Sequence, residues 1–193
     1  MEKHPGGEAA SRDLIRRSGL TAGMAILDMG AGAGETVALL RSLGFCVTGI
    51  DREPRDPSVT AGDYLKGLPW EEHFDGVISQ CSFYCSGNPL AALKTACRVL
   101  KPGGMLMLSD VCPDSSDLGQ MAESAGFQVL YREDETALWK QYYLQALWRG
   151  AVSPVHDGRK YHYETLLCRK PAQSIFSKSC VLHNAKCLGS QGF

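Results

Sequence analysis

The chain has 193 residues, of which 44% are hydrophobic, and a formal net charge of −1. This length supplies one hydrophobic core and is too short for two comfortable domains, so we expect one. Lysines and arginines form no dense basic cluster, which leaves no basic footprint for nucleic acid. No apolar run approaches the roughly 18 residues that span a bilayer, and residues 1–13 lack the apolar core of a signal peptide. We therefore expect a cytoplasmic protein without a nucleic-acid or membrane partner.

The chain begins with a turn-prone segment, residues 4–7 (His-Pro-Gly-Gly), ahead of a helical pattern carried by Leu14, Ile15 and Leu20. Ser11 is the expected cap of the first turn of this helix. One interpretation is a loose terminus followed by a packing helix. The other places the turn at residues 4–7 over the ligand of the glycine-rich loop that follows.

The segment 24–52 predicts a strand, a glycine loop, a helix and a second strand in succession. Gly30, Gly32 and Gly34 make a turn in which backbone can approach a ligand closely. Asp51 closes the second strand, where an acid can accept both hydroxyls of a ribose lying across the first turn. This segment therefore predicts a site for a nucleoside-containing cofactor. The elements expected here are a strand at 24–27, a helix at 35–43 and a strand at 45–50.

Residues 52–74 separate Asp51 from Asp75 and carry two early prolines, Pro54 and Pro57. Prolines at these positions discourage the crossover helix that usually joins two parallel strands, so we expect that helix to be missing or reduced. The remaining elements predicted from apolar periodicity are strands at 58–62, 74–79, 105–109, 126–130 and 161–168, and helices at 90–100, 118–125 and 136–151.

Strands that alternate with helices predict an α/β fold with a parallel sheet covered on both faces. Ligands of such sheets lie beyond the carboxyl ends of the strands, at the point where the strand order reverses. Several polar residues follow predicted strands and should therefore gather at this edge: the glycine loop, Asp51, Asp63, Ser79, Gln80 and Asp110. Residues 171–193 show no clear period, and we expect a tail there behind a single domain of residues 1–170.

The chain carries a set of short motifs: Asp28 followed by Gly-x-Gly-x-Gly, Gly49-Ile50-Asp51, Gly62-Asp63, Phe74-Asp75-Gly76-Val77, Leu100-Lys101-Pro102-Gly103-Gly104 and Ala125-Gly126-Phe127. In these motifs the sequence resembles the class I S-adenosylmethionine-dependent methyltransferase family over roughly residues 1–170. The last two motifs are typical of the small-molecule, methyltransferase type 11-like branch. The resemblance implies a Rossmann-like, doubly wound, mostly parallel sheet of about seven strands whose last strand is antiparallel. It also implies S-adenosylmethionine as cofactor, S-adenosylhomocysteine as product and a small-molecule methyl acceptor.

Residue by residue, the resemblance implies that the backbone from Gly30 through Ala31 and Gly32 to Gly34 meets the methionine portion, with Asp28 ordering that loop. Asp51 would hold the ribose hydroxyls. The other implied contacts are Arg52 beside the adenine, Asp63 at the adenine amino group, the backbone N–H of Tyr64 at the adenine, and Ser79 with Gln80 at the sulfonium end. No metal is implied.

Two departures from the family pattern bear on function. The helix between the second and third strands is missing or reduced, which would expose sheet surface that a partner, the tail or the amino terminus must cover. Residues 79–84 lack the Asn-Pro-Pro-Tyr type of sequence that holds a flipped nucleic-acid base, which again argues against nucleic acid. A general base is needed only for a protonated nucleophile, and Asp110, Tyr84 and His156 are the candidates by position.

Three alternatives stay open at this point. An NAD-dependent oxidoreductase would share the glycine turn and the ribose acid. A non-catalytic S-adenosylmethionine-binding module would use the open sheet face or the aromatic helix after Thr136 for assembly, and the same two surfaces are candidates for a homodimer. Third, Cys81, Cys85 and Cys112 could gather as a site for a thiol or metalloid acceptor, although several of the eight cysteines fall in expected strands, where such thiols are usually small core residues.

Overall fold

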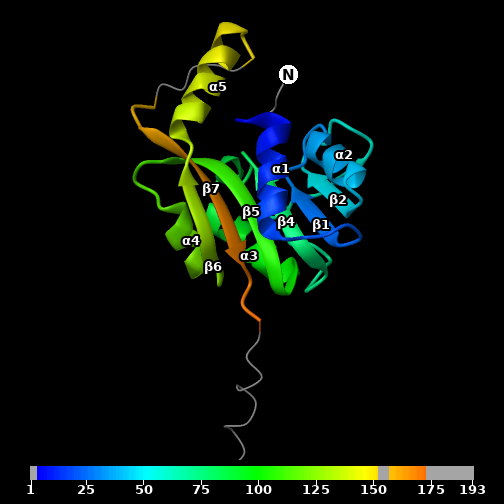
Figure 1. Cartoon of the computed structure of the whole chain (residues 1–193). Helices are drawn as coiled ribbons and strands as arrows, with labels where there is room; N and C mark the ends of the chain where they lie inside the picture. The colour runs from blue at the N-terminus through cyan, green and yellow to red at the C-terminus, as the bar shows by residue number, and fades with distance from the viewer. Residues whose placement is uncertain (1–3, 152–156, 173–193) are drawn as a thin grey trace, which may run out of the picture.

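A seven-stranded sheet with the order β3-β2-β1-β4-β5-β7-β6 organises the chain in the computed structural model, which describes residues 4–151 and 157–172 (Figure 1). Strand β7 runs antiparallel to both of its neighbours, and the pairings from β3 through β5 are all parallel. The predicted fold class is confirmed, including the antiparallel last strand. The strands are β1 Ala25–Met29, β2 Cys46–Asp51, β3 Val59–Ala61, β4 Phe74–Gln80, β5 Leu100–Pro113, β6 Gln128–Asp134 and β7 Tyr161–Arg169.

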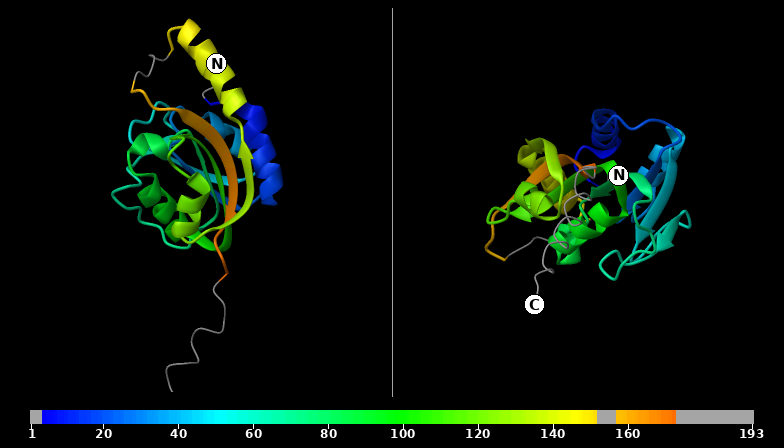
Figure 2. Two further views of the ribbon diagram at one scale, coloured as in Figure 1. Left: turned by 90° about the vertical axis from the view of Figure 1, so that its left-hand side faces the viewer. Right: turned by 90° about the horizontal axis from the view of Figure 1, so that it is seen from below.

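Both faces of the sheet carry an apolar core because successive side chains of a strand point to opposite faces. Ile26 of β1 packs with Leu14 and Leu40, from the first two helices, whereas Leu27 packs with Leu93 in a second cluster. Figure 2 shows helices on either side of the strands, as the alternating pattern predicts. The helices are α1 Gly7–Ser18, α2 Glu35–Ser42, α3 Pro89–Val99, α4 Leu118–Ser124 and α5 Thr136–Trp148, with a 3₁₀ turn, η1, at Tyr84–Ser86.

Residues 52–58, all of which are described, contain no helix, so the predicted loss of the crossover between β2 and β3 is confirmed. The loop that follows β3 does not take its place, because it lies on the other face of the sheet, the face that α3 covers. Its side chains Leu65, Leu68 and Trp70 pack against the core cluster that holds Leu27. Arg98 of α3 donates to the backbone carbonyls of Leu68 and Trp70 and anchors this loop. The surface beside α2, where a helix between β2 and β3 would pack, is therefore not the surface that this loop covers.

Several predicted boundaries are wrong. Strand β1 ends at Met29, so Asp28 lies within it, and β5 continues to Pro113 because its last residues pair with β7, so Asp110 lies inside that strand rather than after it. Strand β6 begins at Gln128 and α5 ends at Trp148. Ser11 is not a cap, because Gly6 occupies the N-cap of α1 with φ +73° and the Ser11 side chain is buried within the helix.

Helix α5 extends beyond the end of the sheet, beside the amino-terminal turn (Figures 1 and 2). Ala146 is its only described residue that is fully buried, whereas Trp148 is 91% exposed. Leu138 lies against the turn, since its Cδ2 is 3.5 Å from the position of a Cβ at Gly6. No helix among the described residues has the length and apolar character needed to cross a membrane. The predicted tail lies outside the described residues from position 173 onward.

Candidate functional site

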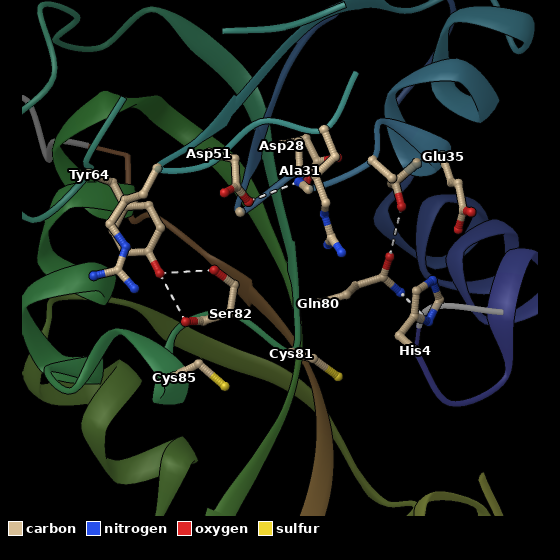
Figure 3. A pocket seen from close by; sticks show the side chains of 16 residues that line it. His4, Asp28, Ala31, Glu35, Asp51, Tyr64, Gln80, Cys81, Ser82 and Cys85 are labelled. Carbon is tan, nitrogen blue, oxygen red and sulfur yellow. Dashed lines mark hydrogen bonds between the residues drawn. The ribbon is translucent and has the colours of Figure 1, made fainter. Parts of the chain in front are cut away.

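A cavity of about 280 Å³ opens at the carboxyl ends of β1, β2 and β4, where the strand order reverses around β1 (Figure 3). Eight of the eleven predicted cofactor-binding residues lie in its wall: Asp28, Gly30, Ala31, Gly32, Asp51, Arg52, Tyr64 and Gln80. The remaining wall residues are His4, Ala33, Glu35, Thr36, Arg55, Cys81, Ser82 and Cys85. The cavity therefore joins the ends of three strands with the amino-terminal turn.

The glycine loop between β1 and α2 is fastened to the end of β2. The backbone N–H groups of Gly30 and Ala31 both donate to the carbonyl of Ile50, each at 2.9 Å. Gly30 has φ +88°, and a Cβ atom there would lie 2.0 Å from Oγ of Ser82. Only glycine suits this position, because a side chain would be both strained and in collision with the turn after β4.

Asp51, the last residue of β2, accepts backbone hydrogen bonds from the glycine loop and from the turn that follows the strand. Its Oδ2 accepts the N–H of Gly32 at 2.9 Å, and its Oδ1 accepts the N–H of Glu53 at 2.9 Å. A carboxylate oxygen has two lone pairs, so each oxygen keeps acceptor capacity for a ligand. The acid is thus held in a fixed orientation and still able to accept.

Asp28 forms a buried acidic part of the wall. The residue is 4% exposed, and its Oδ2 has no hydrogen-bond partner among the described residues. Burial, with the nearby negative charge of Asp51 as a second cause, raises the pKa of Asp28 to about 7. A ligand that brings a positive charge or a donor to this carboxylate would relieve both effects.

Gln80, the last residue of β4, ties helices α1 and α2 to the sheet. Its Oε1 accepts from the hydroxyls of Ser11 and Thr36, at 3.0 and 3.3 Å. Its Nε2 lies 3.4 Å from Nδ1 of His4. The turn at residues 4–7 therefore reaches the same cavity as the glycine loop, which is the second of the two sequence interpretations.

Tyr64 contributes its side chain to the wall. Its hydroxyl donates to the carbonyl oxygen of Ser82 at 2.9 Å, and Oγ of Ser82 lies at the same distance. Burial raises the pKa of Tyr64, with the Ser82 hydrogen bond acting in the opposite direction. The ring fixes the loop after β3 against the turn after β4.

Three of the predicted cofactor residues lie outside the cavity wall. The Asp63 carboxylate accepts the backbone N–H of Leu65 and so closes its own turn. Ser79 is fully buried and donates to the carbonyl of Met29, which joins β4 to β1. Gly34 is the N-cap of α2. Their positions at strand or loop ends gave the sequence signal, but none of the three lines the cavity.

Neither of the two described candidate bases, Asp110 and Tyr84, lines the cavity. Asp110 is fully buried, and its two oxygens accept the backbone N–H groups of Tyr84 and Val111 at 3.0 and 2.8 Å. Burial raises its pKa to about 6. Tyr84 lies in η1 and is absent from the wall, and His156 lies outside the described residues. Asp110 instead holds the turn that carries Ser82 and Cys85.

Two of the three cysteines considered as a cluster reach the cavity. Cys81 and Cys85 lie in its wall, whereas Cys112 is buried elsewhere in β5. Burial raises the pKa of Cys81 to about 12, and its Sγ lies 3.8 Å from the Tyr163 hydroxyl. Within the described part of the chain, no three His, Cys, Asp or Glu side chains are placed to hold a metal. The alternative in which all three thiols gather at one site is therefore not supported.

A family model described as a methyltransferase domain matches residues 4–151. The chain belongs to the class I S-adenosylmethionine-dependent methyltransferases. One relative in this family is the uncharacterized methyltransferase YodH of Bacillus subtilis, 31% identical over 151 residues. That alignment covers 68% of this chain and 64% of YodH, so the chain spans just under two thirds of this relative's length.

Solved methyltransferase structures share the fold. A putative sarcosine dimethylglycine methyltransferase from Galdieria sulphuraria aligns with a TM-score of 0.69 at 18% identity, covering 85% of this chain and 84% of that one. Phosphoethanolamine N-methyltransferase 2 of Haemonchus contortus, crystallised with S-adenosyl-L-methionine, also gives 0.69 at 18% identity and covers 87% of this chain and 54% of its own. At this identity the likeness concerns the fold alone.

Proposed function

We propose that the cavity binds S-adenosylmethionine and that the protein transfers its methyl group to a small-molecule acceptor, leaving S-adenosylhomocysteine. The observation that carries this proposal is the pairing of two acids across the glycine loop: Asp51, held on the N–H of Gly32, and the buried Asp28. The cofactor combines a ribose diol with cationic groups, and the two acids suit those two features separately. When bound, it supplies an electrophilic methyl group on a sulfonium.

Asp51 would accept the ribose hydroxyls, and Asp28 with its unpartnered Oδ2 would face the cationic methionine portion. The backbone of Gly30, Ala31 and Gly32 leaves room for the methionine portion because the loop has no side chain larger than methyl at these positions. Arg52 and Tyr64 would border the adenine. Asp63, Ser79 and Gly34 would act through the scaffold, holding the loops that carry these contacts.

The acceptor would enter past Gln80, Cys81 and the amino-terminal turn, at the end of the cavity opposite Tyr64 (Figure 3). Gln80 would fix this end, because two hydroxyl donors set the orientation of its amide. The chain's main task would be alignment and exclusion of water, and positioning alone can supply roughly 7–11 kcal/mol in favourable cases. We assign no general base, since Asp110 is committed to backbone.

The proposal also covers the extent of the domain, the location of the protein in the cell and its oligomeric state. Residues 1–170 would form the methyltransferase domain of a cytoplasmic protein. A homodimer would use α5, whose exposed Leu144 and Trp148 offer apolar surface. Sedimentation velocity of the wild type beside Trp148→Ala would test this arrangement.

Calorimetric titration with S-adenosylmethionine and S-adenosylhomocysteine tests the proposal. Both should bind wild type, and Asp51→Ala should bind far more weakly. No binding by wild type would refute it, as would a rise in melting temperature with NAD instead of S-adenosylhomocysteine. Transfer of labelled methyl across a broad acceptor panel then separates an enzyme from a binding module, since a module would bind the cofactor tightly and methylate nothing.

A further inference from the structure

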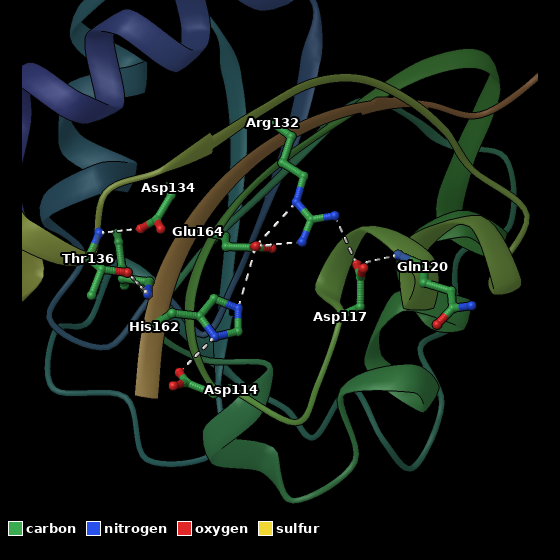
Figure 4. A network of polar contacts seen from close by, with 9 residues as sticks. Asp114, Asp117, Gln120, Arg132, Asp134, Thr136, His162 and Glu164 are labelled. Atoms are coloured by element: carbon green, nitrogen blue, oxygen red, sulfur yellow. Dashed lines mark hydrogen bonds and ion pairs between the residues drawn. The ribbon is translucent and has the colours of Figure 1, made fainter. Parts of the chain in front are cut away.

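A second cavity, of about 630 Å³, lies where β5 and β6 end and β7 begins (Figure 4). Polar side chains from β6, β7, the start of α5 and the loop before α4 line it. It shares no wall residue with the cavity described above, so the cofactor proposal does not account for it.

Glu164 of β7 is the buried centre of this cavity. Its side chain is 7% exposed, and its Oε1 accepts from Nε and a terminal nitrogen of Arg132 at 3.1 and 2.6 Å. Its Oε2 has no hydrogen-bond partner in the described part of the chain. A buried carboxylate oxygen without a donor is costly, because desolvation is not offset on that side. The oxygen is therefore an acceptor whose donor is missing from the described residues.

The side chains around Glu164 form an open ring (Figure 4). Arg132 pairs with Asp117 at 3.0 Å, and the ring of His162 lies 3.4 Å from both Asp114 and Glu164. Four carboxylates line the cavity, counting Asp134, against the two cations Arg132 and Lys140. With histidine neutral, four minus two leaves two negative charges, so the cavity attracts cations and repels anions.

A metal ion does not suit the ring, because no three of its ligand-type side chains converge as a metal site among the described residues. A protonated amine has different needs. It brings one positive charge and several N–H donors that can reach acceptors spaced around it. We propose that this second cavity binds a small organic amine in its protonated form, with Glu164 Oε2 as the buried acceptor and the Asp114 and Asp117 carboxylates as its outer partners.

Titration calorimetry with ethylamine tests the site on the full chain at about pH 8, where alkylamines are protonated and free histidine is neutral. Ethylamine should bind wild type, and Glu164→Gln should weaken it by roughly tenfold or more, as expected for loss of a charged hydrogen bond. Asp114→Asn, whose side chain is 53% exposed, should weaken it several-fold and should fold even where Glu164→Gln does not. Glu71→Gln, an exposed acid in the loop before β4, is the matched control and should bind as wild type.

Tetramethylammonium separates hydrogen bonding from charge, since it carries the same charge without N–H donors. It should bind much more weakly than ethylamine. Saturation with S-adenosylhomocysteine should leave ethylamine affinity unchanged, because the two cavities are distinct. The proposal is overturned by absence of ethylamine binding, which would mean that water alone serves Oε2. It is also overturned by equal binding of tetramethylammonium, by equal loss in Glu71→Gln, or by competition with S-adenosylhomocysteine.

Discussion

The Asp51 carboxylate accepts the backbone N–H of Gly32 at 2.9 Å, so one side chain both shapes the glycine loop and faces the cavity. Asp51→Asn keeps an oxygen that can accept from Gly32 but removes the charge, whereas Asp51→Ala removes both. A hydrogen bond to a charged group is worth roughly 1.5–3 kcal/mol, so S-adenosylhomocysteine affinity should fall about 10- to 100-fold in Asp51→Asn and further in Asp51→Ala. Calorimetry measures this, with Glu53→Gln as the neighbouring-acid control. Equal affinity in wild type and Asp51→Asn would contradict it.

Gly30→Ala should destabilise the fold through a collision with Ser82. The control is Gly103→Ala, because Gly103 has a similar φ, +82° against +88°, but nothing within 4 Å of its Cβ position. Left-handed backbone alone should cost Gly103→Ala roughly 1–2 kcal/mol of unfolding free energy. Gly30→Ala should lose a further 1–3 kcal/mol or so from overpacking. Urea denaturation compares the two variants. Equal losses of unfolding free energy would contradict the prediction and would show that Ser82 moves aside at no cost.

Asp110→Ala should affect stability and leave the cofactor chemistry intact. The substitution strips the buried acceptor from the N–H of Tyr84, and an unsatisfied buried donor costs roughly 1–3 kcal/mol. The unfolding free energy should fall by that amount in urea denaturation. S-adenosylhomocysteine affinity should stay within a few-fold of wild type, because Asp110 is not in the cavity wall. A large loss of S-adenosylhomocysteine affinity without loss of stability would contradict this and would indicate that Asp110 acts in the cofactor site.

The sequence predicts the sheet well because buried parallel strands read as short apolar runs and their ends carry the polar residues. Ile26 and Leu27 show why the scaffold is predictable: adjacent apolar residues of one strand serve the cores on the two faces. The site is harder, since a residue at a strand end can turn either way. Asp51, at the end of β2, lines the cavity. Ser79, near the end of β4, instead donates to the backbone carbonyl of Met29.

The missed residues come from places with no local pattern. Thr36 and Ser11 enter the site by bonding to Gln80 across long sequence separations, and Arg55 by lying over the loop at Gly32. The prediction that Asp110 follows a strand is wrong because the length of β5 depends on its pairing with β7, which is distant in sequence. Only the tertiary arrangement could reveal these relations.

Asp28→Asn should stabilise the ligand-free protein at neutral and alkaline pH. The pKa of Asp28 is raised from 3.8 to about 7 in the fold, so the folded state holds the proton more tightly than the unfolded chain. Its contribution to stability is therefore full below the unfolded pKa and is lost as pH rises through the window from about 4 to about 7. The advantage of Asp28→Asn should grow across that window to roughly 2–4 kcal/mol and then level off. Unfolding free energies measured by urea denaturation across this pH range would test it, and a constant difference between the two proteins at every pH would contradict it.

The same raised pKa predicts proton release when the cofactor binds. A cationic group placed beside Asp28 favours its ionised form, so binding near pH 7 should release roughly half a proton per site, and less at higher pH, where Asp28 is already ionised. Calorimetry in two buffers with different ionisation enthalpies measures the released proton. S-adenosylhomocysteine should release as much as S-adenosylmethionine, because both carry the ammonium group expected beside the glycine loop. Asp28→Asn should abolish the release, and proton uptake, or release that persists in this variant, would place the cationic group away from Asp28.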